Sequence, residues 1–247
     1  MTDAITLVKI IAYLSAIAKA NPAISPVNDT SASCIPNTIA PIKLNLFLRV
    51  TGDILSLQTC ILPRYEIIMI LRRDFYLQNP MDVARALCGA WLCREMPNGK
   101  LVRAQICELE LYLENDRACH AFGGRCTARN DAMFMAGGYA YVYLCYGLHN
   151  MFNVVLGAAG TPAAVLIRAL EYDNCNGPAK LTKRLQITRD DNKLDLTCGT
   201  KIWLEPRDRI PKIKTGSRIG VDYAGADAHL PYRFAIANSP YISKPMK

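Results

Sequence analysis

The chain has 247 residues, 51% of them hydrophobic, so its length excludes neither one large domain nor two small ones. Its ten cysteines contain no CxxC pair and mostly lie in apolar runs, which argues against a small secreted domain built on disulfides. The formal net charge is +8; residues 1–68 carry 5 basic and 4 acidic side chains, whereas residues 69–247 carry 24 and 17. A basic body suits a polyanion such as nucleic acid, although an ordinary protein of high isoelectric point has the same balance.

Neither a metal site nor a membrane span is expected. The three histidines are not spaced at i, i+3 or i+4 from one another or from a cysteine pair, so no metal and no other cofactor is predicted. Residues 10–18 form an apolar run far shorter than the roughly 20 residues that cross a bilayer. A secretory signal peptide stays open as an alternative, because the run has a suitable length and small residues follow it.

Residues 21–59 contain four prolines, a stretch rich in Ser, Thr and Asn, and no sustained period of 2 or 3.6. This composition predicts a poorly ordered extension over residues 1–68 and an ordered domain over residues 69–247. Met69 would also serve as an internal start, so a second interpretation is that residues 1–68 are an artefact of gene calling. The intact mass of the protein made from its native locus distinguishes the two.

The first predicted elements of the domain are a helix and a hairpin. Asn79 and Pro80 form an N-cap and first turn, an apolar stripe follows, and Gly89 stands where the helix should stop. The segment 97–99, Pro-Asn-Gly, separates residues 91–95 from 101–112, which predicts an antiparallel return. Further β-rich runs predict an antiparallel meander in an α+β fold: residues 139–146, 151–156, 163–170, 218–222 and 232–236.

The predicted strand 101–112 carries two carboxylates. Strict alternation puts Glu108 and Glu110 at the end of the face formed by Val102, Ala104 and Ile106. A solvated strand end would explain both carboxylates. A carboxylate at the lip of an apolar wall can also act as a general base, the chemistry needed to hydrolyse a glycosidic bond.

Four tyrosines lie within the segment 138–146. Tyr143 and Tyr146 are three residues apart, so alternation turns them to opposite sides and one can line a pocket while the other faces outward. For Tyr139 and Tyr141 ordinary packing on a sheet suffices. Tyr146 precedes the Gly147 turn, and an exposed aromatic ring at a hairpin tip could stack on, or wedge between, nucleic-acid bases.

Two polar residues interrupt apolar runs. Asn153 lies within 151–156 and Arg168 within 163–170, and each must find a partner if it is buried. An Asn bound into the sheet and an Arg paired with a core carboxylate would both be structural, so a functional role stays open. The segment 123–130 is a basic loop with two glycines, suited to phosphate contacts or to an ordinary surface.

An ordered series of short motifs resembles the alkyladenine (3-methyladenine) DNA glycosylase family. The likeness spans about residues 70–243. The motifs are ELELY at 108–112, ACH at 118–120, GR at 124–125, Thr127, RN at 129–130, MF at 133–134, YVYLCYG at 141–147, NV at 153–154, VLIRALE at 165–171, GPAKL at 177–181, RIG at 218–220 and PYRF at 231–234.

The resemblance implies a single α+β domain with a curved antiparallel sheet, flanking helices and a β-hairpin that inserts into DNA. It implies a monofunctional enzyme, acting as a monomer, that flips an alkylated or deaminated purine out of double-stranded DNA. The enzyme would hydrolyse the N-glycosidic bond without a covalent lysine intermediate and leave an abasic site. The expected location is the cytoplasm, on the nucleoid, or the nucleus of a eukaryote, with no membrane partner.

The resemblance also implies a role for particular residues. Glu110 would activate the water that attacks the sugar, and Arg168 would help to hold that water. Tyr146 would be the intercalating wedge. The remaining matches fall into two sets: base-pocket contacts at Tyr112, His120, Tyr143 and Asn153, with Asn153 crowding the amino group of guanine, and DNA-backbone contacts at Arg125, Arg129 and Lys180.

The chain departs from the family pattern at several positions. Leu109 and Leu111 replace smaller residues and should point away from the carboxylates. The spacing from Tyr112 to His120 is one residue short, Ala128 stands where proline is frequent, and a helical insert is nearly absent at 171–176. The shortened segments leave a second hypothesis, a nucleic-acid-binding protein without turnover; an unrelated secreted protein is a third.

Overall fold

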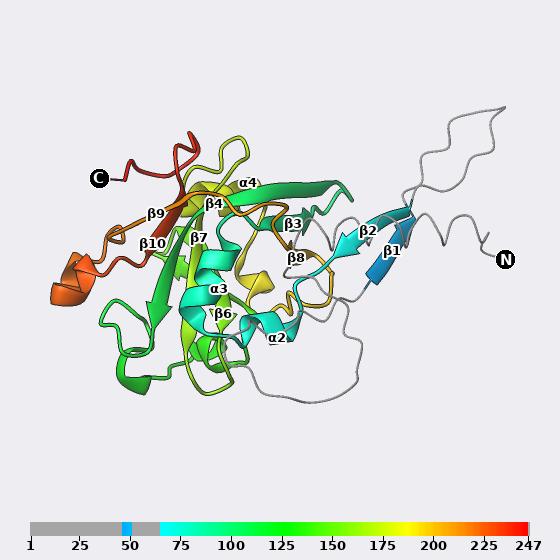
Figure 1. Cartoon of the computed structure of the whole chain (residues 1–247). Helices are drawn as coiled ribbons and strands as arrows, with labels where there is room; N and C mark the ends of the chain where they lie inside the picture. The colour runs from blue at the N-terminus through cyan, green and yellow to red at the C-terminus, as the bar shows by residue number, and fades with distance from the viewer. Residues whose placement is uncertain (1–45, 51–64, 247) are drawn as a thin grey trace, which may run out of the picture. The chain divides into compact units, whose positions relative to one another are not determined.

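The computed structural model describes residues 46–50 and 65–246 (Figure 1). Most of the predicted N-terminal extension, including the apolar run 10–18, lies outside these residues. Within the described part of the extension, β1 (Leu46–Val50) and β2 (Tyr65–Met69) pair antiparallel. Among the residues described, no helix combines the length and the apolar character needed to span a membrane.

An eight-stranded sheet forms the body of the domain, and all its pairs are antiparallel. Six of the strands follow the order β5–β6–β7–β4–β10–β9. The first half of β4 also pairs with β3, and β3 pairs in turn with β8. The long strand β4 thus pairs with β3 at its start and with β7 and β10 farther on, which curls the sheet. The bounds are β3 (Trp91–Glu95), β4 (Leu101–Leu113), β5 (Ala140–Cys145), β6 (His149–Leu156), β7 (Ala163–Leu170), β8 (Ile202–Glu205), β9 (Ile213–Gly216) and β10 (Arg233–Ile236).

Short helices flank this sheet, and the predicted α+β class is confirmed. The predicted helix is α3 (Pro80–Leu87): the Asn79 side chain accepts a hydrogen bond from the Met81 backbone N–H at 2.9 Å, and Val83, Ala84 and Leu87 are buried. Gly89 follows with φ +94°, a conformation that favours glycine. The other helical segments are α2 (Arg73–Tyr76), α4 (Pro178–Arg184), η1 (Phe122–Gly124), η2 (Asp131–Phe134), η3 (Arg189–Asp191) and η4 (Asp222–His229).

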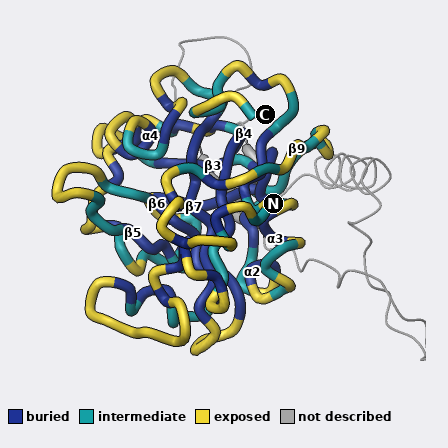
Figure 2. Tube along the Cα trace, turned by 90° about the vertical axis from the view of Figure 1, so that its left-hand side faces the viewer, coloured by how far each residue is buried: buried dark blue, intermediate teal, exposed yellow. Residues whose placement is uncertain are grey.

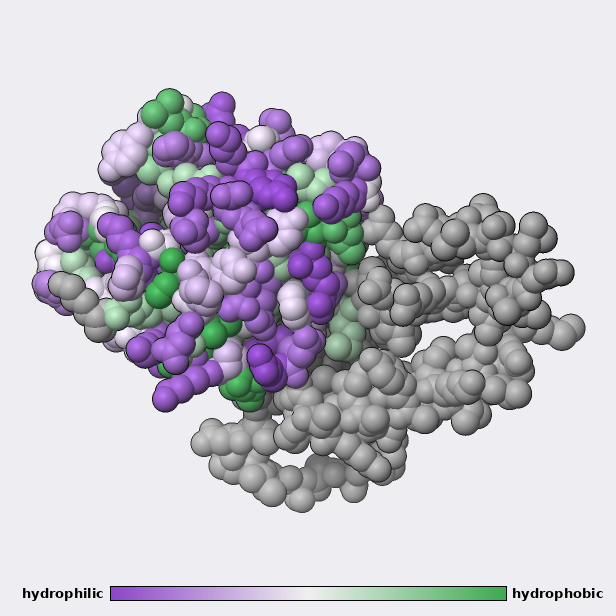
Figure 3. Space-filling view, turned by 90° about the horizontal axis from the view of Figure 1, so that it is seen from above, coloured by the Kyte–Doolittle hydropathy of each residue, from purple (hydrophilic) through white to green (hydrophobic). Residues whose placement is uncertain are grey.

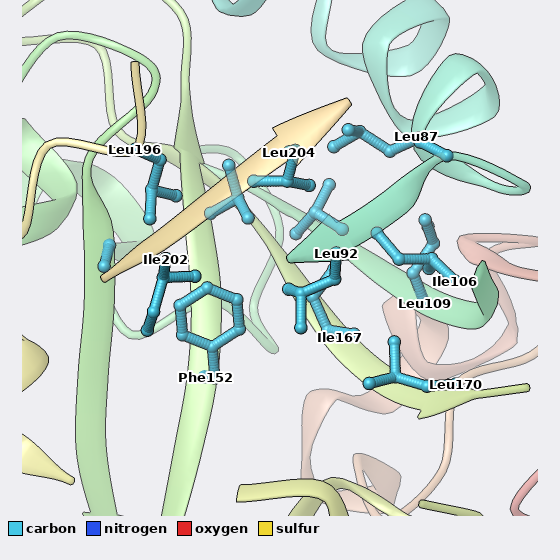
Figure 4. Packing of buried hydrophobic residues seen from close by; sticks show 14 of the residues in the cluster. Leu87, Leu92, Ile106, Leu109, Phe152, Ile167, Leu170, Leu196, Ile202 and Leu204 are labelled. Atoms are coloured by element: carbon cyan, nitrogen blue, oxygen red, sulfur yellow. The ribbon is translucent and has the colours of Figure 1, made fainter. Parts of the chain in front are cut away.

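The main core lies against β4 and β7. Figure 4 shows Leu109, Ile167 and Leu170 packed with Leu87 of α3 and Phe152 of β6. Burying each such side chain stabilises the fold by about 1.5–3 kcal/mol. Most strands of the sheet are buried along much of their length, whereas β9 is not, and most exposed segments lie in loops (Figure 2). The face seen in Figure 3 is mostly hydrophilic, with hydrophobic side chains in small separate groups.

The expected alternation along β4 is wrong. Its register with β7 shifts on both sides of Glu108, and the side chains change phase there. Ile106 therefore shares the main core with Leu109 and Leu111, not a face with Glu108 and Glu110. The two leucines point away from the carboxylates, as expected. β7 changes phase at the same place, because Ile167 and Leu170 pack in the core whereas Arg168 does not.

The C-terminal strands also differ from expectation. Residues 218–222 were predicted as a strand, but they form a loop leading into η4, and β9 (Ile213–Gly216) pairs with β10 instead. Two interactions explain the loop. The Arg218 guanidinium is buried against Asp116, and the Ile219 backbone N–H donates to the Glu110 side chain, so this segment does not bond to a neighbouring strand.

Candidate active site

A pocket of about 680 Å³ opens on the side of the sheet opposite the main core. Strands β4, β5, β6 and β7 and the loop before η4 supply its wall. The structure brings together seven of the residues singled out in the sequence; the pocket is lined by Tyr112, His120, Arg129, Tyr143, Tyr146, Asn153 and Arg168. Glu110, Arg125 and Lys180 do not line it.

The two carboxylates of β4 are fully buried, so the solvated strand end is excluded. Glu110 Oε1 accepts a hydrogen bond from the Ile219 N–H at 2.8 Å. Its Oε2 accepts one from the Tyr112 hydroxyl at 2.8 Å and one from Arg168 Nη1 at 3.1 Å. Glu110 is therefore held from three directions directly behind the pocket wall.

Arg168 connects both carboxylates to the pocket. Its Nε donates to Glu108 Oε1 at 3.0 Å and its Nη1 to Glu110, and only 7% of the residue is exposed. Burial opposes the charged guanidinium, but the negative charges of Glu110 and Glu108 outweigh it and hold the pKa of Arg168 above its usual value. The core pairing considered in the sequence is present, and Arg168 also lines the pocket.

An aromatic cluster forms one side of the pocket. The His120 and Tyr143 rings meet edge to face with centroids 4.6 Å apart, and His120 Nδ1 lies 2.9 Å from the Tyr141 hydroxyl. Burial, aided by the charge of Arg129, lowers the pKa of His120 and so favours the neutral imidazole. The shortened spacing from Tyr112 thus still allows His120 to reach the pocket.

Tyr141 is a pocket residue that packing arguments missed. It is buried, lines the pocket and touches both His120 and Tyr143. The signal was available, because Tyr141 and Tyr143 are two residues apart on β5 and so share a face. Tyr139 contacts Arg73 instead, whose guanidinium lies 4.2 Å from the ring centroid.

Tyr112 lies between the carboxylate and a second buried arginine. Its hydroxyl donates to Glu110, and burial followed by the charge of Glu110 holds the pKa of Tyr112 well above its usual value. The Arg218 guanidinium is 4.8 Å from the Tyr112 ring centroid and is itself paired with the buried Asp116. Arg218, Asp116 and the Ile219 N–H were not identified from the sequence as parts of the site.

Asn153 is fixed by the sheet. Its Nδ2 donates to the carbonyl oxygens of Tyr141 at 3.0 Å and Met151 at 3.3 Å, and the residue is buried. The bound-in-the-sheet interpretation therefore holds, and the same side chain lines the pocket. Because Nδ2 is committed to carbonyl acceptors, the amide cannot flip freely.

Tyr146 is outside any strand, in the turn that joins β5 to β6. Its φ is +50° and it is 93% exposed, while Leu148 in the same turn is 78% exposed. Tyr143 lies on β5 and is half-buried, so the pair differs in exposure as expected, although the turn and not strand alternation is the reason. An aromatic ring therefore projects at the mouth of the pocket.

The predicted backbone contacts lie at different places. Arg129 lies at the pocket, where its Nη2 donates to the Leu144 carbonyl at 3.1 Å. Arg125 is exposed on the basic loop, which the buried Asn130 holds by donating to the Arg125 carbonyl at 2.9 Å. Lys180 is exposed on α4 and donates to Asn176 at 3.1 Å. Over the described residues, no three or more His, Cys, Asp or Glu side chains group as a metal site.

Comparison with known proteins identifies the chain as a DNA glycosylase, a hydrolase that acts on N-glycosyl bonds. Residues 74–240 match the family described as methylpurine-DNA glycosylase, and the chain belongs to that family. A relative from Methanocella arvoryzae is 43% identical over 194 residues, covering 71% of this chain and 96% of the relative. One from Carboxydothermus hydrogenoformans is 42% identical, covering 71% and 100%, and one from Myxococcus xanthus is 42% identical, covering 70% and 93%. Each carries the provisional name 3-methyladenine DNA glycosylase.

Proposed function

We propose that the chain is a monofunctional glycosylase that removes alkylated or deaminated purines, 3-methyladenine among them, from double-stranded DNA. The observation that carries the proposal is the buried Glu110–Arg168 pair directly behind an aromatic pocket. The names of the relatives support the choice of 3-methyladenine. A pure DNA-binding protein would have no use for a buried carboxylate and guanidinium held at an aromatic pocket.

The damaged nucleotide reaches the pocket by flipping out of the duplex. Flipping costs a few kcal/mol and is least costly for a weakly paired base, which favours damaged positions before the pocket is entered. Stacking on the rings of Tyr112, His120 and Tyr143 offsets this cost, at about 1–3 kcal/mol for each base–aromatic contact. Tyr146, 93% exposed at the β5–β6 turn, is the wedge that fills the vacated place in the stack.

Hydrolysis uses one water and no covalent intermediate. A carboxylate can accept about four hydrogen bonds, and the protein uses three on Glu110. The remaining site, on Oε1, accepts the water proton. The water oxygen bonds to the sugar C1′, and the C1′–N bond breaks with its electron pair leaving on the purine. Arg168 orients the water and balances the charge of Glu110.

Selectivity and affinity come from different residues. Asn153, its amide fixed by two carbonyls, crowds the amino group of an undamaged guanine. Arg125, Arg129 and Lys180 contact phosphates, so binding weakens as salt is added. We infer that residues 69–247 carry this activity as a monomer, in the cytoplasm or a eukaryotic nucleus, wherever the DNA lies, and that residues 1–68 are not required for it.

The proposal is tested with a labelled duplex that carries one hypoxanthine or one ethenoadenine. After incubation with the protein, alkali should cut the strand at that position and not in the undamaged duplex. Binding without strand cutting would favour the alternative, a DNA-binding protein that has lost turnover. Failure both to bind and to cut would remove the DNA-repair assignment for this chain.

A further inference from the structure

The carboxylate behind the candidate active site is held by the C-terminal segment 241–246. Glu108 lies next to Arg168 and is 0% exposed. It receives hydrogen bonds from Arg168 Nε at 3.0 Å, Arg233 Nε at 2.8 Å and the Ser243 hydroxyl at 2.8 Å, and another from the Ser243 backbone N–H. The segment is tied down by Arg233, whose Nη2 donates to the Lys244 carbonyl.

Ser243 also contacts Arg168 directly. Its hydroxyl oxygen lies 3.3 Å from Arg168 Nη2 and 3.4 Å from Arg168 Nε. The hydroxyl can accept from the guanidinium while it donates its proton to Glu108. One small side chain thus bridges both members of the ion pair, and it holds the edge of the guanidinium that Glu110 does not reach.

The orientation of Arg168 needs this third contact. Nη1 donates to Glu110 and Nε donates to Glu108, which is shared with Arg233, but neither carboxylate reaches Nη2. The Ser243 hydroxyl fixes the plane of the guanidinium by contacting Nη2 and Nε, on the edge that Glu110 does not reach. Arg168 lines the pocket, where the proposed function requires a water to be held.

We propose that Ser243 is a positioning residue for base excision: it orients Arg168 through the hydroxyl bridge to Glu108. This inference rests on the proposed function. It adds a residue outside the span 74–240 that matches the family, and it makes the C-terminal segment part of the active site. Ser243 does not line the pocket, so it acts through Arg168 and touches no reacting atom.

The test compares single-turnover excision of hypoxanthine by the full chain and by Ser243→Ala. Loss of a hydrogen bond to a charged group should lower the excision rate about 10-fold or more, with the Kd for abasic DNA within about 2-fold of wild type. The backbone N–H of residue 243 still reaches Glu108 in this variant, so the segment should stay docked. Ser243→Thr keeps the hydroxyl and should recover the rate to within about 3-fold.

Ser239→Ala is the matched control. Ser239 is a buried serine two residues before the segment, and its hydroxyl accepts from the Tyr241 N–H without contacting Arg168 or Glu108. The control should leave the excision rate within about 2-fold of wild type. In an Arg168→Lys background, adding Ser243→Ala should cost less than about 2-fold, because the forked contact is already lost.

The inference is overturned by a Ser243→Ala rate within about 2-fold of wild type, by an equal loss in Ser239→Ala, or by full additivity with Arg168→Lys. A loss that Ser243→Thr does not recover would likewise assign Ser243 a purely structural role. Failure of the proposed function itself is recognised separately, because the wild-type chain would then release no base, and the inference would fall with it.

Discussion

Glu110→Gln tests whether Glu110 is the general base of the candidate site. The substitution keeps the shape of the side chain but removes one of the two negative charges that face Arg168. It also places an amide N–H₂ group among three hydrogen-bond donors, one each from Ile219, Tyr112 and Arg168. Only one of the two side-chain oxygens remains, so at least one donor loses a strong acceptor.

The expected magnitudes follow from this geometry. Breaking a buried ion pair by removing one partner costs about 3–5 kcal/mol of folding stability, and Glu110 is 0% exposed. Removal of a general base lowers the rate by about 10²–10⁴-fold. Affinity for abasic DNA should be kept, because no phosphate contact changes. Single-turnover excision from a hypoxanthine duplex, abasic-DNA titration and urea unfolding measure the three quantities.

Glu205→Gln is the matched control for this experiment. Glu205 is a nearly buried glutamate on β8, bonded to Arg103 at 2.7 Å and to Trp203 at 3.0 Å, and it does not line the pocket. It should lose about 1–3 kcal/mol of stability with an unchanged excision rate. Residual activity of Glu110→Gln within 10-fold of wild type, or an equal loss in the control, would refute the assignment of Glu110 as the base.

Three further predictions concern pH, the wedge and the phosphate contacts. The pKa of His120 is lower in the folded chain than in the unfolded one, so the unfolded state binds the extra proton; stability is complete above the unfolded pKa of about 6.5 and falls as pH drops below it. Urea unfolding at pH 7.5 and 5.5 should show this loss, and His120→Gln should reduce it. Tyr146→Ala should lower excision from duplex at least about 10-fold while the free energy of unfolding changes by less than about 0.5 kcal/mol. A loss of stability in urea large enough to account for the lower rate would contradict the role of Tyr146 as a wedge. Arg125→Ala and Lys180→Ala should each reduce the salt dependence of DNA binding by about one unit of slope; an unchanged slope in fluorescence titrations would place those side chains off the DNA.

Local chemistry was sufficient for some of the regular elements, whereas α2, α4 and β8 (Ile202–Glu205) were not predicted. The Asn79–Pro80 pair and Gly89 predicted α3, and the turn residues at 97–99 predicted that β4 returns antiparallel to β3. β9 (Ile213–Gly216) was missed because its four residues show no apolar alternation and are held by pairing with β10. The loop 218–222 was misassigned because its apolar residues resemble a strand, whereas the burial of Arg218 beside Asp116 is visible only in three dimensions.

The site itself was predictable in part. Family resemblance located the pocket side chains, because resemblance depends on residue type. It could not locate the Ile219 N–H, because almost any residue type can supply a backbone N–H donor. Ser243 could not be identified from the sequence either, because a single serine near the end of a chain is common and indicates no particular role. Only the fold brings it to Glu108.

The phase change in β4 and β7 explains why the site exists at all. With strict alternation, Glu108 and Glu110 would share the face of Ile106 and enter the main core, where no charge could be satisfied. The irregular register at Glu108 turns both carboxylates to the other side of the sheet, and the matching irregularity beside Arg168 delivers the guanidinium to the same place. A substitution that regularised this pairing would send a carboxylate toward the leucines of the core. The bulge is therefore as necessary to the active site as the charged side chains that it presents.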